Sequence, residues 1–295
     1  MPLADIARSG PTLEASALQR TVLGNGLVFH HAEAGAGVPL VFLHGVLGDW
    51  RTWAPQWAAF VPHFRCISYS RRYSVPNANR QASPDHSALA EADDLEALLA
   101  RWQAAPAVLV GASYGAYTAL ALAARRPDQV RALVLVEPPL MRLADGTAEG
   151  RATREDFDRR IRLPARQAFE AGDDARAVWL LTEGILGGTD LGQQSAAAMG
   201  RRLENAESLR RVTLSTDEFP ALDMKRLANL DVPMLLLSGE RTPPIHDVVF
   251  QALVQALPRA DSRKVPGAGH GVARDQPALF NALVRDFLAR HGLPP

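Results

Sequence analysis

Short apolar runs alternate with amphipathic segments along the first half of the chain. The runs at residues 39–43, 64–69, 107–110 and 132–136 are mostly apolar at consecutive positions, which is typical of strands buried on both faces of a parallel sheet. Between two of them, residues 87–102 place leucines and a tryptophan at helical spacing, with acidic residues on the other side. This β–α alternation predicts an α/β fold with a doubly wound, mostly parallel sheet and right-handed crossovers.

A hairpin precedes this region, and an irregular region follows it. Asn25-Gly26 lies between residues 18–23 and 27–31, and Asn-Gly is a preferred turn of two-residue β-hairpins, so these two segments are expected to form one. From Pro138 to about residue 228 the chain is rich in Ala, Arg, Glu and Leu, and no segment resembles a buried strand. This region predicts a helical insertion.

Within the insertion, residues 165–171 and 174–184 are expected to be helices, and Gly187-Gly188 and Gly192 are expected to separate helices. The strand and helix patterns return afterwards, as strands at 233–237 and 262–265 and as helices at 247–257 and 277–290. The predicted organisation is therefore a core of residues 1–137 and 229–295 with a helical cap of residues 138–228.

Composition narrows the class of protein. The chain has 295 residues, 47% of them hydrophobic, with 32 basic and 32 acidic side chains, so no net field attracts a polyanion and nucleic acid is not expected as a partner. One cysteine cannot form an intrachain disulfide or a cysteine-rich zinc site. Residues 1–12 lack the apolar run of a signal peptide, and no apolar stretch is long enough to cross a bilayer. We expect a cytoplasmic protein with a small-molecule substrate and no membrane partner, and the composition leaves homo-oligomer formation open.

The strongest chemical motif is Gly-Ala-Ser-Tyr-Gly at residues 111–115. It follows a predicted strand and opens a predicted helix, the setting in which G-x-S-x-G lifts a serine hydroxyl out of a sharp, strained turn. The helix start also brings a positive dipole end, and the Tyr114 amide, close to a developing oxyanion. A glycine-rich turn without chemistry is the alternative, and the strand–turn–helix context disfavours it.

Two histidine-containing turns follow predicted strands. His270 lies in Gly-Ala-Gly-His-Gly at residues 267–271, a loop that would let its imidazole approach a serine as general base. The turn at residues 43–46 can aim a backbone amide at the same reaction centre, with His44 as a structural hydrogen-bonding residue. His30 and His31 are adjacent in a strand and point to opposite faces, so no histidine cluster and no metal site is expected.

A serine–histidine pair needs a buried carboxylate, and the sequence offers several. Glu137 ends the strand at 132–136, on the same sheet edge as Ser113, and we expect Pro138 to keep its backbone extended. Glu240 and Asp247, after the strand at 233–237, are alternatives. Glu137 is the preferred acid; the competing interpretation is that it only caps the strand and binds the insertion.

These motifs resemble those of the α/β-hydrolase family. The resemblance rests on His44-Gly45 after the third strand, the motif at 111–115, an insertion after the sixth strand and Gly269-His270 near the end, and it covers nearly the whole chain. It implies an α/β-hydrolase fold in which a mostly parallel central sheet is flanked by helices and a helical cap is inserted after the sixth strand.

The resemblance also implies residue roles. Ser113 corresponds to the nucleophile, His270 to the base, and Val46 and Tyr114 to the oxyanion-hole donors. The family's commonest acid is an aspartate at the position that Thr242 occupies here, and threonine cannot ionise. Some members, among them certain lactonases and haloalkane dehalogenases, place a glutamate after the sixth strand, which matches Glu137.

Other polar and apolar residues near these turns are interpreted structurally. Arg71 and Arg72 follow the strand at 64–69 and could meet an anionic substrate, but a solvated or salt-bridged role is favoured. Apolar residues of the insertion either line a pocket above Ser113 or form the core of the cap; they are Leu140, Phe157, Trp179, Leu180, Ile185 and Leu186.

The predicted function is a cofactor-independent serine hydrolase that cleaves an ester, thioester or lactone of a small to medium apolar substrate through an acyl-enzyme. The same residues would serve carbon–carbon bond hydrolysis or a lyase step. A ligand-binding protein that has lost catalysis on a hydrolase scaffold is the non-enzymatic alternative, and the intact serine and histidine motifs argue against it.

Overall fold

The computed structural model describes residues 12–80, 83–187 and 196–294. The predicted breaks at Gly188 and Gly192, and nearly all of the N-terminal segment in which no signal peptide is expected, lie outside these residues. Within the described part of the chain, no helix is both long and apolar enough to cross a membrane.

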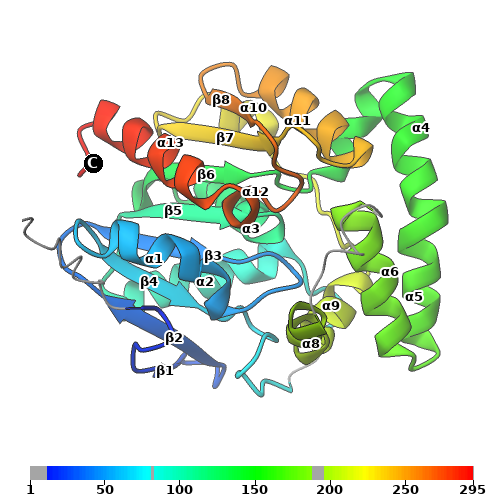
Figure 1. The fold of residues 1–295 in the computed structure, drawn as a ribbon, viewed down its shortest axis with the longest axis horizontal. Helices are drawn as coiled ribbons and strands as arrows, with labels where there is room; N and C mark the ends of the chain where they lie inside the picture. The colour runs from blue at the N-terminus through cyan, green and yellow to red at the C-terminus, as the bar shows by residue number, and fades with distance from the viewer. Residues whose placement is uncertain (1–11, 81–82, 188–195, 295) are drawn as a thin grey trace, which may run out of the picture.

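An eight-stranded sheet forms the centre of the molecule (Figure 1). Its strands are β1 (Gln19–Val22), β2 (Val28–Ala34), β3 (Pro39–Leu43), β4 (Arg65–Tyr69), β5 (Ala107–Ala112), β6 (Val130–Val136), β7 (Met234–Gly239) and β8 (Asp261–Val265). The spatial order is β1-β2-β4-β3-β5-β6-β7-β8. β2 pairs antiparallel with both β1 and β4, and all other neighbours are parallel. All eight predicted strands, two of them from the hairpin at Asn25-Gly26, are confirmed.

Two helical layers cover the sheet because its central strands are apolar on both faces. Leu40 and Phe42 of β3 pack on one side with α1 (Ala54–Phe60) and α13 (Pro277–Arg290), whereas Val41 and Leu43 face the other layer. That second layer contains three helices: α2 (Ala88–Trp102), α3 (Tyr114–Arg125) and α11 (Pro244–Ala256). Alternate side chains of β3 therefore belong to two separate hydrophobic cores, one on each face of the sheet.

The described residues between β6 and β7 form helices and no strand. They are η3 (Met141–Gly146), α4 (Ala148–Phe157), η4 (Asp158–Arg162), α5 (Leu163–Glu170), α6 (Asp174–Leu186), α8 (Ala196–Glu204), α9 (Ala206–Thr213) and α10 (Met224–Ala228). In Figure 1, α4, α5, α6, α8 and α9 gather at one side of the sheet. The helices predicted at 165–171 and 174–184 correspond to α5 and α6.

Three short helical segments complete the core: η1 (Trp50–Trp53), η2 (Pro127–Gln129) and α12 (Val272–Asp275). The last begins two residues after His270, and its first residue, Val272, is fully buried. The sequence pattern did not indicate this turn of helix.

Several side chains singled out from the sequence are structural. Cys66 is fully buried in β4, and burial raises the pKa of its thiol. Arg71 forms a buried ion pair with Glu91, with two nitrogen–oxygen distances of 2.5 Å, and Arg72 pairs with Asp94 at 2.7 Å. Both arginines are thus salt-bridged, as favoured from the sequence.

Candidate active site

Ser113 occupies the turn between β5 and α3. Its φ and ψ angles are 51° and −121°, a combination that costs a non-glycine residue roughly 1–3 kcal/mol. The neighbouring glycines make the turn feasible: a Cβ on Gly115 would lie 2.3 Å from the Leu43 carbonyl oxygen, and one on Gly111 would lie 2.6 Å from Ala116 Cα. The G-x-S-x-G motif therefore has the strained strand-to-helix geometry predicted for it.

A buried carboxylate at the end of β6 contacts the predicted base. Glu137 is 2% exposed, and its Oε2 accepts a hydrogen bond from His270 Nδ1 at 2.5 Å. Its Oε1 accepts from Ser238 Oγ at 2.7 Å and from the Gly239 amide at 2.8 Å. Thr242 Oγ1 donates to Oε2 at 2.8 Å. The carboxylate is thus held by four donors from the ends of β7 and β8.

These contacts determine the charge of the carboxylate and the tautomer of the imidazole. Burial opposes ionisation of Glu137, but the hydrogen bond from His270 prevails, together with the charge that this ring carries when it is protonated, and the pKa of Glu137 is lowered to about 2. An ionised carboxylate requires a proton on His270 Nδ1, which leaves Nε2 available as a base. This is the arrangement that orients a general base.

The backbone of Glu137 differs from the prediction. Its φ angle is 43°, so the expectation that Pro138 keeps this residue extended is wrong. The left-handed conformation costs of order 1 kcal/mol or more, and the four hydrogen bonds to the carboxylate offset that cost. β6 nevertheless ends at Val136, directly before Glu137 and Pro138.

The alternative acids lie elsewhere. Glu240 Oε2 accepts from the Gly267 amide at 3.0 Å, and Asp247 pairs with Lys264 at 2.6 Å. Thr242, at the commonest acid position of the family that the sequence resembles, contributes a hydroxyl that supports Glu137. Of these carboxylates, only Glu137 contacts His270.

The turn after β3 and the start of α3 flank the serine. Val46 and Ser113 line the same cavities, and Tyr114 lines one of them as the first residue of α3. His44 is fully buried; its Nε2 accepts from the Arg71 amide at 3.0 Å and its Nδ1 donates to the Gly45 carbonyl at 2.8 Å. His44 is therefore structural, as expected, because both ring nitrogens already hold the loop.

A second histidine, His246, contacts the base, although the sequence pattern did not indicate it. Its ring stacks on His270 with centroids 4.0 Å apart and an interplanar angle of 21°, and its Nε2 lies 3.2 Å from the Ile185 carbonyl oxygen. Burial, then the charge of His270, lowers the pKa of His246 to about 3, so this ring is neutral near pH 7. His246 has no motif around it, and only the fold brings it to the site.

The stacked pair also bears on metal binding. Ligand atoms of Glu137, His246 and His270 lie within 4.8 Å of one another, so the expectation that no histidines cluster is wrong. Imidazole lone pairs lie in the ring plane, and nearly parallel stacked rings direct them side by side rather than toward one ion. The arrangement suits proton transfer better than metal coordination.

Ser113 lies between two cavities that differ in size. The larger cavity, of about 390 Å³, is lined by His270, Val46 and residues of η1 and α8. The smaller cavity, of about 40 Å³, has mainly apolar walls, and the Arg162–Glu218 ion pair also lines it. Ser113 Oγ makes no hydrogen bond to His270 among the described residues, although both line the larger cavity. Such contacts often form only when substrate is bound.

Some of the apolar residues of the insertion that were singled out from the sequence line a cavity, and others do not. Phe157, Ile185 and Leu186 line these cavities, whereas Leu140 is buried in the core and Trp179 is 48% exposed. The insertion therefore supplies walls of the cavities as well as packing.

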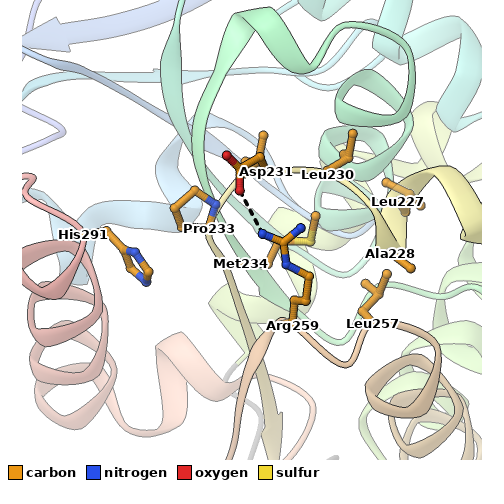
Figure 2. Close-up of a pocket in the computed structure, with 11 residues that line it drawn as sticks. Leu227, Ala228, Leu230, Asp231, Pro233, Met234, Leu257, Arg259 and His291 are labelled. Carbon is orange, nitrogen blue, oxygen red and sulfur yellow. Dashed lines mark hydrogen bonds and ion pairs between the residues drawn. The ribbon is translucent and has the colours of Figure 1, made fainter.

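A further cavity lies away from the serine (Figure 2). It has a volume of about 190 Å³, and it lies beside Met234 at the start of β7, whereas Glu137 contacts the end of that strand. The ion pair between Asp231 and Arg259, at 2.8 Å, lies along its wall. Its eleven lining residues include no serine or cysteine, so they provide no nucleophile of that kind.

Comparison with known proteins agrees with this architecture. The model of the alpha/beta hydrolase family matches residues 40–283, which span β3 to α13. The chain belongs to the α/β-hydrolase family. The eight-stranded, mostly parallel sheet with its flanking helices is the fold expected from the sequence motifs.

Individual relatives of this α/β hydrolase are hydrolases of different kinds. It is 28% identical over 272 residues to the sn-1-specific diacylglycerol lipase ABHD11 of Mus musculus, which covers 89% of this chain and 85% of the lipase. It is 34% identical over 127 residues to the 2-hydroxymuconate semialdehyde hydrolase of Pseudomonas sp. strain CF600, covering 40% and 42% of the two chains. The structure of Est816, described as an N-acyl homoserine lactone degrading enzyme, superposes with a TM-score of 0.73 at 22% identity and covers 91% of this chain and 100% of Est816.

Proposed function

We propose that this α/β hydrolase is a cofactor-independent serine hydrolase that cleaves an ester, thioester or lactone through an acyl-enzyme. The observation that carries the proposal is the 2.5 Å contact between His270 Nδ1 and the buried Glu137 carboxylate, at a cavity shared with the strained Ser113. A fold of this type hosts many activities, so the proposal rests on the site rather than on the fold.

In the proposed first half-reaction, His270 Nε2 accepts the proton of Ser113 Oγ as the oxygen attacks the substrate carbonyl carbon. The Val46 and Tyr114 amides stabilise the oxyanion, and Glu137 stabilises the imidazolium. The bond from the carbonyl carbon to the leaving group then breaks, and His270 gives its proton to the departing oxygen or sulfur.

In the second half-reaction, water enters the place of the leaving group. His270 removes a proton from the water, the hydroxide attacks the acyl-enzyme, and Ser113 regains its proton as the carboxylic acid departs. His246, which is neutral near pH 7, keeps its ring face stacked against the His270 imidazolium in both half-reactions.

Fluorophosphonate labelling combined with ester hydrolysis tests the proposal. The wild-type protein should be labelled at Ser113 and should hydrolyse p-nitrophenyl acetate, and Ser113→Ala should do neither. Ser87→Ala is a matched control, since this serine precedes α2 and lines neither cavity at Ser113. A wild-type protein that is not labelled and does not hydrolyse the ester would refute the mechanism.

Cleavage of a carbon–carbon bond is the second candidate, favoured by the likeness to 2-hydroxymuconate semialdehyde hydrolase over part of the chain. It would use the same Ser113, His270 and Glu137. Turnover of 2-hydroxymuconate semialdehyde at least about tenfold faster than that of esters, measured as kcat/KM, would favour it.

A further inference from the structure

The imidazole of His270 has one hydrogen bond to the described part of the chain, which is the bond from Nδ1 to Glu137 Oε2 at 2.5 Å. Its neighbours in the loop, Gly269 and Gly271, have no side chains that could pack against the ring. A single hydrogen bond fixes the position of Nδ1 but leaves the ring plane free to tilt. The proposed base therefore needs a second contact, because Nε2 must point at Ser113 Oγ for the proton transfer.

His246 of α11 supplies a contact of this kind. Both histidines are buried, and their ring centroids lie 4.0 Å apart with an angle of 21° between the planes. Carbon atoms are at their optimal separation at about 3.5–4.0 Å, so a tilt of the His270 ring would drive its edge into the ring of His246. The stack thus restrains the one movement that the hydrogen bond to Glu137 leaves free.

The helical insertion holds His246 in turn. His246 Nε2 lies 3.2 Å from the carbonyl oxygen of Ile185, in the last turn of α6. A carbonyl oxygen can only accept, so Nε2 carries the proton and donates it to this bond. The last carbonyl groups of a helix have no partner within the helix, and the bond from His246 satisfies one of them.

Ile185 also meets the space at the serine, because it lines both cavities to which Ser113 belongs. One residue of the insertion therefore borders the space open to a substrate and holds the ring that stacks on the base. The contacts run from α6 through His246 to His270, and the second hydrogen bond of this chain, from His270 to Glu137, ends at the carboxylate.

We propose that His246 is a positioning residue, whose ring fixes the plane of the His270 imidazole so that Nε2 is aimed at Ser113, and which Ile185 of the insertion holds in place. This inference rests on the proposed serine-hydrolase function. His246 transfers no proton in the reaction, since its Nε2 proton is bound to the Ile185 carbonyl. Because it acts through His270, its loss should lower kcat and leave KM unchanged.

Three substitutions separate the ring of His246 from its hydrogen bond. His246→Phe keeps a flat ring without the donor, His246→Gln keeps an amide donor without the ring, and His246→Leu keeps neither. With p-nitrophenyl acetate at pH 7.5, the Gln and Leu variants should lose about tenfold in kcat, the size of one contact between aromatic rings, with KM within about twofold of the wild-type value. His246→Phe should keep kcat within about threefold of the wild-type value, because its ring can still stack on His270.

The rate of fluorophosphonate labelling is a second measurement. His270 must also remove the serine proton in this reaction, so labelling of Ser113 should slow about tenfold in His246→Gln and His246→Leu and much less in His246→Phe. The deacylation step uses the same base, and kcat should therefore fall whichever half-reaction limits it.

His31→Gln is the matched control. His31 is 2% exposed, and its ring packs on Trp102 with centroids 4.8 Å apart, but it lines neither cavity at Ser113. The free energy of unfolding in urea is measured for every variant. The folded His31→Gln protein should have the wild-type kcat even where its stability is lower, so a loss of kcat confined to the His246 variants does not follow from weakened packing alone.

The pattern across the variants decides the question. The proposal is overturned if folded His246→Gln has the wild-type kcat, or if His246→Phe loses as much kcat as His246→Gln, because kcat would then not follow the ring. A rise in KM at unchanged kcat would overturn it as well, since His246 also lines the smaller cavity and would then act by contacting the substrate. If His246→Leu does not fold, the Phe and Gln variants still decide between these outcomes.

Ser113→Ala separates this inference from the proposed function. If Ser113→Ala abolishes hydrolysis and labelling while the His246 variants behave as the wild type, only the positioning role fails. If Ser113→Ala keeps the wild-type hydrolysis and labelling, the serine mechanism fails, and the role of His246 in that mechanism fails with it.

Discussion

Replacing Glu137 with glutamine tests the centre of the proposed mechanism. The side chain keeps its size, but one of its two acceptor oxygens becomes an amide that donates hydrogen bonds. Oε1 accepts from Ser238 Oγ and the Gly239 amide, and Oε2 accepts from Thr242 Oγ1 and His270 Nδ1. In either orientation of the new amide, its NH₂ group therefore faces former donors.

The orientation of the new side-chain amide determines which hydrogen bond to residue 137 is lost. The Gly239 amide is a backbone donor that cannot be reversed, so the glutamine oxygen should stay toward Ser238 and Gly239. The NH₂ group then faces His270 Nδ1, which must become an acceptor, and the proton moves to Nε2, where it blocks the base. The wrong tautomer costs a serine–histidine–acid site about ten-thousandfold in kcat, equivalent to about 5.4 kcal/mol of barrier.

The assay is kcat for p-nitrophenyl acetate at pH 7.5, with the free energy of unfolding in urea measured in parallel. Thr242→Val is the matched control, because it removes one hydrogen bond to the same carboxylate and leaves the charge unchanged. It should lower kcat by roughly tenfold or less, as expected for one neutral hydrogen-bond donor to a charged group.

A double variant makes the test sharper. Thr242→Asp places a second carboxylate beside Glu137 Oε2, so in the Glu137→Gln background it should recover at least about tenfold of the lost kcat. The reasoning is refuted if Glu137→Gln and Thr242→Val have equal, mild effects on kcat while both proteins remain folded.

The remaining predictions concern the turn at the serine and the buried charges. Gly115→Ala should destabilise the fold by about 1–3 kcal/mol and reduce fluorophosphonate labelling of Ser113, because the added Cβ would lie 2.3 Å from the Leu43 carbonyl oxygen of β3. Full labelling at wild-type stability would contradict this. Glu91→Gln should lower the free energy of unfolding in urea by about 3–5 kcal/mol, because it leaves the buried Arg71 without a carboxylate. Asp93 is exposed, and Asp93→Asn should change this free energy by about 0.5 kcal/mol or less. Burial, then the charge of Arg71, lowers the pKa of His44 to about 4, below its usual value of about 6.5. As the pH falls through 6.5, His44 therefore binds a proton in the unfolded chain but not in the folded protein. The free energy of unfolding should therefore fall between pH 6.5 and about 4, and His44→Gln should remove about 2 kcal/mol of the loss measured at pH 4.5. Equal pH dependence of stability in both proteins would contradict this.

Much of the fold was predictable because burial leaves a local pattern. A strand covered on both faces must be apolar at consecutive positions, and the runs at β3, β5 and β6 showed this directly. The turn at Ser113 was predictable from the spacing of its glycines, although Gly115 is required by a contact with the distant Leu43 carbonyl of β3. Glu137 could be preferred as the partner of His270 because β6 ends beside β5, on the same sheet edge as Ser113.

Other parts of the site leave no such pattern. His246 lies in a helix whose periodicity reports only its packing, and its contact with His270 depends on how α11 packs near the loop after β8. The φ angle of Glu137 was predicted wrongly because the rule for a residue before proline describes the isolated chain, whereas four hydrogen bonds determine the conformation here. The arginines of α8 could be counted in the sequence but not assigned to a cavity.

The sequence by itself determined the β–α order, the helical insertion after β6 and the strand-to-helix turn that carries Ser113, because each leaves a pattern in residues close together in the chain. Only the tertiary structure decided which acid meets His270 and which histidine stacks on it. Glu137 and His270 are 133 residues apart, and their contact depends on the strand order that places β6, β7 and β8 side by side. Such contacts depend on register and packing between distant segments, and these are properties of the whole fold.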